Sequence, residues 1–344
     1  GPAGQGNYFQ CDCKPTPSRA GPNSLAASVL DGGVSWRHIL GMRIGLIFNP
    51  TAQGDKARGL QSQLDCISNE CTLMPTEGPG HAEDLAEQAV VDGFEMLVAA
   101  GGDGTVHEVV NGVVRHPEGL NQVALGILPM GTVNVMAREL RMPLDFEAAW
   151  RVIQRGYSRK IDLPWMELQR NGKTLKRCFP ALGGAGIDAR ACELVRWETK
   201  KRSGQLAYII AGFRAANEEM PTFRVQTSER VIESAELIML GNGHMYGGPF
   251  DVFPQARLDD GRVDAIVAER VEKWRAPQYA QAILTGTLPK LDGVHYLQAE
   301  AIELTSVGNK RVSVQLDGDA MGELPGKITV QPLGLKMVMP RLEI

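Results

Sequence analysis

Residues 98–113, VAAGGDGTVHEVVNGV, join an apolar strand to a helix through three glycines and one aspartate. Glycines after a strand permit positive φ and let a ligand approach the backbone, while the first turn of the helix offers unpaired N–H groups. A phosphate suits such a loop, but the carboxylate of Asp103 would repel it. The carboxylate has a use if it binds Mg²⁺ or accepts a proton. A tight turn whose aspartate caps the helix is the alternative.

The flanking sequence alternates between short apolar runs and helical patterns. Buried strands are predicted at RIGLIFNP (43–50), CTLMPT (71–76), FEMLVAAGG (94–102) and VALGILPMGT (123–132), with helices predicted at 80–93, 105–116 and 133–140. This alternation predicts a parallel sheet with helices on both faces, whose ligands bind at the carboxyl ends of the strands. Loops 49–54, 101–105 and 129–134 fall at those ends.

Beyond about residue 160 the pattern is that of a mostly β, antiparallel domain. Two alternating runs flank Asn171-Gly172, which predicts a hairpin. Further strand-like runs follow, interrupted by helical patterns at 204–217 and 273–285. We expect an α/β domain over 42–160 and a β-rich domain over 161–330, with the segment from about 331 to 344 a candidate to return to the first domain.

Composition excludes several classes of protein. The formal charge of the 344 residues is −4 and no long basic run occurs, so a nucleic-acid partner is not expected. No stretch of eighteen apolar residues is present, which argues against a membrane span. The six cysteines form no regular framework, which favours a reduced, cytoplasmic setting. Residues 1–41 lack periodicity and are interpreted as a disordered leader or tag remnant, with a regulatory tail as the alternative.

Familiar nucleotide-binding motifs are absent. NGKT (171–174) lacks the first glycine of a P-loop because Glu167 takes its place, and GGDGTVHE does not have dinucleotide-fold spacing. The combination of motifs nevertheless resembles the diacylglycerol kinase catalytic family, which includes sphingosine and ceramide kinases. The motifs that carry the resemblance occur in family order: NPTAQG (49–54), GGDGTVHEVVNG (101–112), LPMGTVNVMAREL (128–140), GGAGIDA (183–189), GNGHMYGGPFDVFPQARLDDGRVDAIVAE (241–269) and QLDGDAMGELPG (315–326).

This resemblance implies an ATP- and Mg²⁺-dependent lipid kinase whose active site lies between an α/β domain and a β-rich domain. It places the nucleotide on Asn49, Pro50, Thr51, Thr76, Gly101, Gly102, Asp103, Gly104, Thr105, Glu108, Gly131, Thr132 and Asn134. Glu108 has an equally plain alternative as a first-turn acid that the helix dipole favours. Relatives carry an acid after Asn134, where this chain has Val135, so the role of Asn134 is the less secure.

The resemblance assigns proton acceptance to the acids of QLDGD. Relatives read Asp-Gly-Glu, whereas this chain reads Asp317-Gly318-Asp319, so we favour Asp317 as the base with Asp319 as its helper, and Asp103 is the rival. An ordinary hairpin turn is the alternative. Asp188 matches the position that holds the lipid head group. A structural Mg²⁺ is implied at ARLDDGRVD, held by Asp260 and main-chain carbonyls near Arg257 and Arg262, where a simple turn is the alternative.

The implied acceptor is a lipid hydroxyl of diacylglycerol, a sphingoid base or ceramide. A cationic segment followed by a helical pattern (196–218) suggests peripheral contact with the inner face of the membrane, although a solvated face is the commoner explanation. A homodimer is compatible with the resemblance. Two other functions stay open: a kinase acting on NAD, since NAD kinases share the Gly-Gly-Asp-Gly-Thr sequence, and a nucleotide- or lipid-binding regulator without turnover. The six histidines show no ligand spacing, so surface or core placement is expected.

Overall fold

The fold was obtained as a computed structural model that describes residues 41–50, 60–198, 215, 218 and 220–341. The predicted leader up to residue 40, Thr51 and the predicted helix at 204–217 lie outside the described residues, apart from Ala215. Among the residues described, no helix is long and apolar enough to cross a membrane.

The first part of the chain forms a parallel sheet. Its strands are β1 (Ile44–Phe48), β2 (Thr72–Pro75), β3 (Met96–Gly101) and β4 (Ala124–Pro129), in the spatial order β4-β3-β1-β2. These are the four predicted strands. Because all four run parallel, their carboxyl ends meet at one edge, so the loops that begin at Asn49, Thr76, Gly102 and Met130 lie along it.

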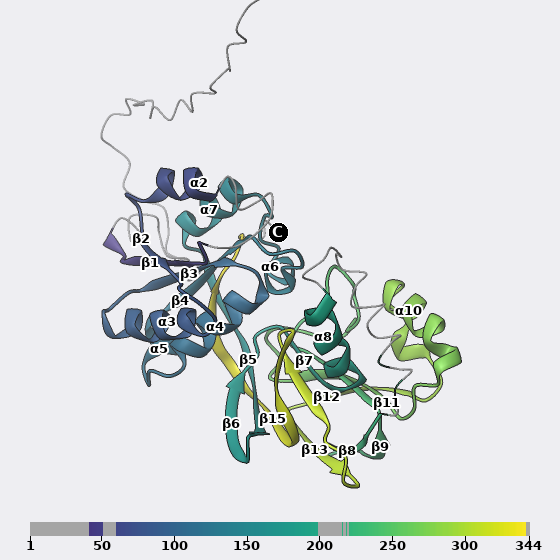
Figure 1. Cartoon of the computed structure of the whole chain (residues 1–344). Coiled ribbons are helices and arrows are strands. Elements are labelled where there is room, and N and C mark those ends of the chain that lie inside the picture. The colour runs from purple at the N-terminus through teal and green to yellow at the C-terminus, as the bar shows by residue number, and fades with distance from the viewer. Residues whose placement is uncertain (1–40, 51–59, 199–214, 216–217, 219, 342–344) are drawn as a thin grey trace, which may run out of the picture. The chain divides into compact units, whose positions relative to one another are not determined.

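Helices cover both faces of this sheet. In Figure 1, α3 (His81–Val91), α4 (Asp103–Val113) and α5 (Gly119–Gln122) lie below the strands, and α2 (Leu60–Ile67) and α7 (Phe146–Arg155) lie above. The short helix α6 (Val135–Glu139) follows β4. Strand residues such as Leu97, Val98 and Leu128 are completely buried. The parallel strands therefore read as continuous apolar runs because both of their faces are covered.

The rest of the chain is antiparallel. Its strands are β5 (Ser158–Arg170), β6 (Lys173–Cys178), β7 (Leu182–Gly186), β8 (Thr222–Gln226), β9 (Val231–Ala235), β10 (Leu237–Gly241), β11 (Val263–Ala268), β12 (Val294–Ala299), β13 (Ala301–Val307), β14 (Ser313–Leu316) and β15 (Asp319–Val338). Helix α8 (Ile187–Glu198) follows β7, and η3 (Lys273–Arg275), α10 (Ala276–Leu284) and η4 (Leu288–Lys290) separate β11 from β12. The predicted hairpin is confirmed: β5 and β6 pair around Asn171 and Gly172, both with positive φ.

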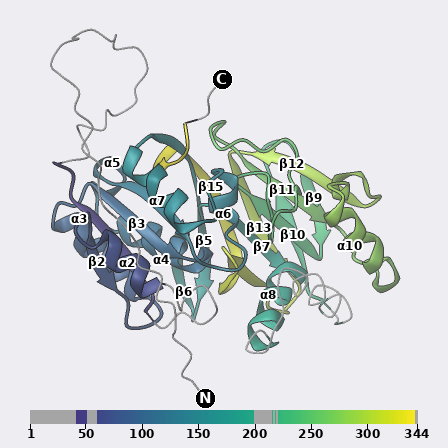
Figure 2. The ribbon, with the colours of Figure 1, turned by 90° about the horizontal axis from the view of Figure 1, so that it is seen from above.

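The long strand β15 joins the two parts. It pairs with β14 at its start and with β5 along much of its length, and Met337 near its end pairs in parallel with Leu125 of β4. The yellow strand of Figure 1 shows this path. From above, β12 and β11 lie at one edge of the connected sheet and β1 and β2 at the other (Figure 2). The end of β15 therefore continues the parallel sheet beyond β4.

The predicted fold class, an α/β part with a parallel sheet followed by an antiparallel β-rich part, is confirmed by this architecture. We call the part up to β4 with its helices the first lobe, and we call the part formed by β5 to β14 the second lobe.

Candidate active site

Close packing surrounds two glycines of residues 101–105, which we call the glycine loop. A Cβ on Gly131 would lie 2.5 Å from Cα of Gly102, and one on Gly101 would overlap the side chain of Thr105. The permitted positive φ is not used here: Gly102 has φ −93°, and none of the loop's glycines is among the residues with positive φ. The loops after β3 and β4 instead approach backbone to backbone, which excludes side chains.

The other predicted nucleotide contacts lie at the same edge. Thr76 is buried and its N–H donates to the carbonyl of Phe48, whereas Asn49, Pro50 and Thr132 are exposed. Asn134 is buried, adopts φ 55° as the N-cap of α6, and donates from Nδ2 to the Gly131 carbonyl at 2.7 Å. Asn134 therefore shapes the loop after β4, since asparagine tolerates this left-handed conformation.

Asp103 is the first residue of α4, and its carboxylate reaches the start of α6. Its Oδ1 accepts the N–H of Met136 at 3.4 Å. Burial and the nearby negative charge of Asp317 raise the pKa of Asp103 to about 6, against the lowering effect of backbone N–H groups at the start of α6. Asp103 and Asp317 are far apart in the sequence, but they lie close enough in the fold to interact electrostatically.

Asp317 lies in the two-residue turn between β14 and β15. The φ values of 47° at Asp317 and 87° at Gly318 are those of a hairpin turn that favours Asp-Gly. The Asp317 side chain is buried, and its Oδ1 accepts the N–H groups of Ala181 and Leu182 at 3.1 and 2.9 Å. Oδ2 lies 2.8 Å from Nδ1 of His107. Three hydrogen bonds thus occupy the carboxylate that the sequence favoured as the base.

The histidine partner was missed by the sequence reasoning, which gave His107 no role. His107 is only 3% exposed, and four residues further along α4 the buried Asn111 donates to its Nε2 at 3.3 Å. Asn111 also exchanges hydrogen bonds with both backbone groups of Cys178. Polar residues at 103, 107 and 111 share one side of α4. This spacing of four residues is the sequence pattern that could have indicated a role for His107. It identifies the side of α4 that faces the second lobe.

Asp319 approaches the glycine loop from the turn between β14 and β15. A Cβ on Gly104 would lie 3.6 Å from its Oδ2, so the carboxylate sits over the start of α4. The side chain is partly exposed, unlike that of Asp317. The turn therefore directs Asp317 inward to its hydrogen-bond partners and Asp319 toward the glycine loop.

Glu108 has a different role from the predicted one. Its Oε1 accepts the N–H of Gly80 at 2.9 Å and its Oε2 that of Ala82 at 3.2 Å. These N–H groups belong to the first turn of α3, which has no side-chain cap from its own N-cap residue. Glu108 therefore caps a neighbouring helix, which agrees with neither a nucleotide contact nor a first-turn acid serving its own helix.

Asp188 lies at the start of α8, directly after β7. Its Oδ2 accepts the Tyr246 hydroxyl at 2.6 Å and Nε2 of Gln315 at 2.7 Å. Burial raises the pKa of Asp188 to about 6, while these two hydrogen bonds lower it. A Cβ on Gly184 would overlap this carboxylate, which explains a glycine there. Asp188 keeps some exposed surface.

The loop that contains Arg257, Asp260 and Arg262 closes through hydrogen bonds. Oδ1 of the exposed Asp260 accepts the N–H of Arg262 at 3.0 Å. The buried Asp162, which the sequence did not single out, accepts the N–H groups of Gly261 and Leu333 at 2.6 and 2.7 Å. No group of three or more His, Cys, Asp or Glu side chains that could hold a metal occurs in the described parts of the chain. The magnesium ligands predicted here stay a prediction, and nothing below depends on them.

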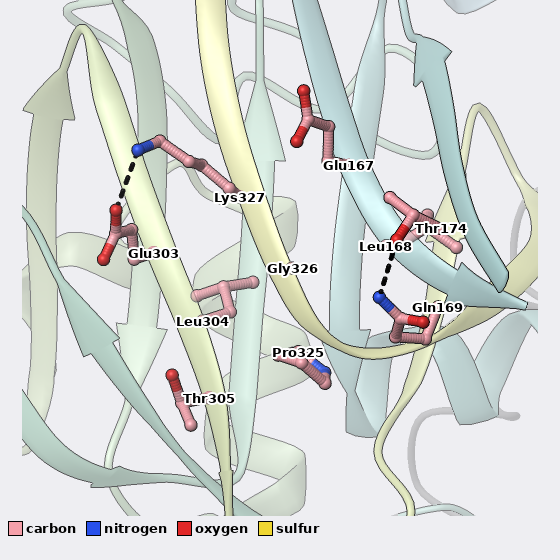
Figure 3. A pocket seen from close by; sticks show the side chains of 10 residues that line it. All are labelled: Glu167, Leu168, Gln169, Thr174, Glu303, Leu304, Thr305, Pro325, Gly326 and Lys327. Carbon is pink, nitrogen blue, oxygen red and sulfur yellow. Dashed lines mark hydrogen bonds and ion pairs between the residues drawn. The ribbon is translucent and has the colours of Figure 1, made fainter. Parts of the chain in front are cut away.

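A hollow of about 310 Å³ lies away from these acids. It is lined by β5, β6, β13 and β15, and Figure 3 shows Lys327 paired with Glu303 across one side, at 2.9 Å. None of the predicted site residues lines it. The candidate active site is accordingly defined by the meeting of the glycine loop with the turn at 317–319.

Two family models match successive parts of the chain. Residues 43–166 match the model of the diacylglycerol kinase catalytic domain, and residues 182–339 match that of the YegS C-terminal NAD kinase beta sandwich-like domain. Each match contains part of the candidate site: the first holds Asp103 and the second Asp188, Asp317 and Asp319.

Curated relatives match across both lobes. A diacylglycerol kinase of Staphylococcus saprophyticus is 30% identical over 290 residues, covering 83% of this chain and 91% of the relative. One of Staphylococcus aureus is 32% identical over 289 residues, covering 82% of this chain and 88% of the relative. A solved structure described as a diacylglycerol kinase of Bacillus anthracis str. Sterne has a TM-score of 0.62 at 22% identity, covering 87% of this chain and 97% of its own, and shows the same fold. The chain belongs to the diacylglycerol kinase family of lipid kinases.

Proposed function

We propose that the protein transfers the γ-phosphate of ATP to the free hydroxyl of diacylglycerol. The observation that carries this proposal is the meeting of the two lobes at Asp103 and Asp317: the charge of one raises the pKa of the other, and His107, one turn beyond Asp103, binds Asp317. A phosphate donor bound at the end of the parallel sheet would there face an acceptor held by the second lobe. The names of the relatives support diacylglycerol over sphingoid bases and ceramide.

The triphosphate would lie on residues 101–105. The absence of side chains on Gly101, Gly102 and Gly104 lets phosphate oxygens approach the backbone, and the N–H groups of the first turn of α4 would donate to them. Thr105, Thr132 and Asn49 remain proposed contacts at the same edge, and so does Thr76. Pro50 and Gly131 would shape the loops around the nucleotide, and Thr51 is proposed from the resemblance alone.

We assign proton acceptance to Asp103. A pKa of about 6 brings it closer to the working pH than an ordinary aspartate, which favours general-base catalysis. Asp317 is buried and holds three hydrogen bonds, so we assign it to positioning in place of the role that the sequence favoured. Orientation matters more than basicity in this reaction because the proton leaves late in a loose transition state.

Asp319 would bind the Mg²⁺ that accompanies ATP. Its carboxylate lies over Gly104, beside the proposed phosphate position, and Mg²⁺ in such sites takes one or two carboxylates together with phosphate oxygens and water. Asp103 belongs to the same loop, and a bound cation would offset the negative charge of Asp317, which together with burial raises the pKa of Asp103. When bound, the ion would neutralise charge on the transferred phosphoryl group.

Asp188 would hold the acceptor. The residue keeps some exposed surface, and its carboxylate would accept a hydrogen bond from a lipid hydroxyl, while Gln315 connects it to the turn that carries Asp317 and Asp319. Because diacylglycerol resides in bilayers, we propose a cytoplasmic protein that contacts the inner face of the membrane. Trp274, 76% exposed between Lys273 and Arg275, has the chemistry of an interfacial anchor. The homodimer stays a prediction.

A lipid panel tests the proposed function. The purified chain is incubated with labelled ATP, Mg²⁺ and mixed micelles that contain diacylglycerol, sphingosine or ceramide, with NAD in a parallel reaction. Phosphatidic acid is the expected product. Phosphorylated sphingosine or ceramide would move the proposal to another lipid, NADP would overturn it, and binding of ATP without transfer to any acceptor would favour a regulator.

A further inference from the structure

One buried glutamine touches both the proposed acceptor site and the turn that carries the acids. Gln315 is completely buried in β14. Its Nε2 donates to Oδ2 of Asp188 at 2.7 Å and to the hydroxyl of Tyr246 at 3.0 Å. Its Oε1 accepts the N–H of Gly318 at 2.9 Å. The two ends of one amide therefore serve two different functional groups.

The surroundings fix the orientation of this amide. A reversed amide would place its carbonyl oxygen against the carboxylate of Asp188 and its NH₂ group against the N–H of Gly318, and both contacts would be repulsive. The observed orientation satisfies the hydrogen bonds of both neighbours. The amide therefore cannot rotate or move without breaking its contacts with Asp188 and Gly318. Gly318 has φ 87° and lies between Asp317 and Asp319, so its N–H helps to set the geometry of both acids.

Tyr246 provides a natural comparison. Its hydroxyl donates to the same oxygen of Asp188, at 2.6 Å, and lies 3.1 Å from the carbonyl of Gly183. Tyr246 makes no hydrogen bond to the turn among those that the structure records for the described residues. Loss of the Tyr246 hydroxyl removes one donor from Asp188, whereas loss of the Gln315 amide removes one donor and also the acceptor that holds Gly318.

We propose that Gln315 is a positioning residue that couples acceptor binding at Asp188 to the geometry of the Asp317–Gly318–Asp319 turn. This proposal rests on the proposed role of Asp188 in acceptor binding. An acceptor hydroxyl that donates to Asp188 would share this carboxylate with the Gln315 amide, so acceptor and amide would belong to one hydrogen-bond network. The same amide then holds the turn, so that the acids are in place when an acceptor is present.

The test compares Gln315→Met with Tyr246→Phe. Both variants lose one donor to Asp188, so we expect the KM for short-chain diacylglycerol to rise by about three- to tenfold in each, the equivalent of one hydrogen bond. Gln315→Met should in addition lower kcat by about tenfold or more, whereas Tyr246→Phe should keep kcat within about twofold. The KM for ATP should stay within about twofold of the wild-type value in both.

A pH series separates positioning from a general loss of structure. Burial raises the pKa of Asp188, and the hydrogen bonds from Gln315 and Tyr246 lower it; the titratable group beside this pair is Cys192, whose charge acts on Tyr246. Removal of either donor should raise the pKa of Asp188. As the pH is lowered, Asp188 becomes protonated and the KM for diacylglycerol should rise. In both variants this rise should begin at a higher pH than in the wild type. A variant that is merely less well folded would not move this dependence.

Gln315→Asn retains the amide on a shorter side chain and serves if Gln315→Met does not fold. It should likewise lower kcat, because it cannot reach both partners. An equal kcat in the Gln315 variants and Tyr246→Phe overturns the proposed coupling, as does a parallel rise in the KM for ATP. Absence of lipid phosphorylation by the wild type contradicts the proposed function itself, and the inference falls with it.

Discussion

Nδ1 of His107 lies 2.8 Å from Oδ2 of Asp317, although 210 residues separate the two in the sequence. Both side chains are buried, and each belongs to a motif that carries the family resemblance. This pair fixes the hairpin turn of the second lobe against the helix that follows the glycine loop. It is the most direct structural reason to treat the two motifs as one site.

Replacement of the histidine should reveal this role. His107→Ala leaves the buried carboxylate without one hydrogen-bond donor, so we expect the free energy of unfolding to fall by about 1–3 kcal/mol. We also expect kcat to fall by about tenfold or more, because the turn is no longer held against α4. Urea unfolding and steady-state kinetics measure the two effects. His116→Ala, at a partly exposed histidine after α4, is the matched control and should change neither.

The pH dependence of the reaction should depend on Asp317. Activity requires deprotonated Asp103, so kcat/KM should rise with pH through about 6. The negative charge of Asp317 is one cause of the raised pKa of Asp103; Asp317→Asn removes it, so the pKa should fall and the acidic limb should move to lower pH. Glu108→Gln, elsewhere on α4, should leave the limb in place. An unmoved limb in Asp317→Asn would argue against direct electrostatic contact.

The capping role of Glu108 makes a separate prediction. Glu108→Ala removes the acceptor for two N–H groups at the start of α3, which should lower the free energy of unfolding by about 1 kcal/mol. The KM for ATP should stay within about twofold of the wild-type value. The opposite result, a large rise in this KM at unchanged stability, would restore Glu108 to the nucleotide site.

Close packing of the glycine loop can be tested with one methyl group. Gly131→Ala would place Cβ 2.5 Å from Cα of Gly102 and 2.7 Å from Oδ1 of Asn134, so the loops after β3 and β4 must separate. We expect a loss of about 1–3 kcal/mol in the free energy of unfolding, together with a higher KM for ATP. Gly78→Ala meets no atom within 4 Å and should be close to neutral. Equal stability of the two variants would contradict the packing argument.

Membrane contact through Trp274 is testable with vesicles. Trp274→Ala should weaken sedimentation with vesicles that contain anionic lipid and diacylglycerol, because the exposed indole no longer reaches the interface. Activity toward short-chain diacylglycerol dispersed in detergent should stay unchanged. Loss of detergent activity would instead indicate a structural role, and unchanged sedimentation would place membrane contact elsewhere.

The sequence predicted the elements of this fold well because their patterns are local. Continuous apolar runs gave β1, β2, β3 and β4, and Asn171-Gly172 gave the hairpin of β5 and β6. The loops at 101–105 and 129–134 could be placed together because parallel strands share one carboxyl edge. The path of β15 back to β4 depends on a pairing at Met337 and could only be suggested.

The partners within the site depend on contacts that are distant in sequence. Nothing local indicates that His107 binds Asp317, that Glu108 caps α3, or that Gln315 lies between Asp188 and Gly318. The glycine loop shows the same limit, because no local pattern indicates that Gly102 lies against Gly131 of the neighbouring loop. Residue types at strand ends could therefore be predicted, but the role of each carboxylate required the packed structure.

We propose above all that Asp103 of the first lobe and Asp317 of the second serve one catalytic site. A double-mutant cycle on kcat/KM for diacylglycerol phosphorylation, with Asp103→Asn, Asp317→Asn and the double variant, tests it directly. Loss of the base alone should cost about 10²- to 10⁴-fold, and the double variant should be little worse than the more damaged single variant, because both changes disable the same site. Multiplicative losses in the double variant would show that the two acids act independently and would contradict the claim.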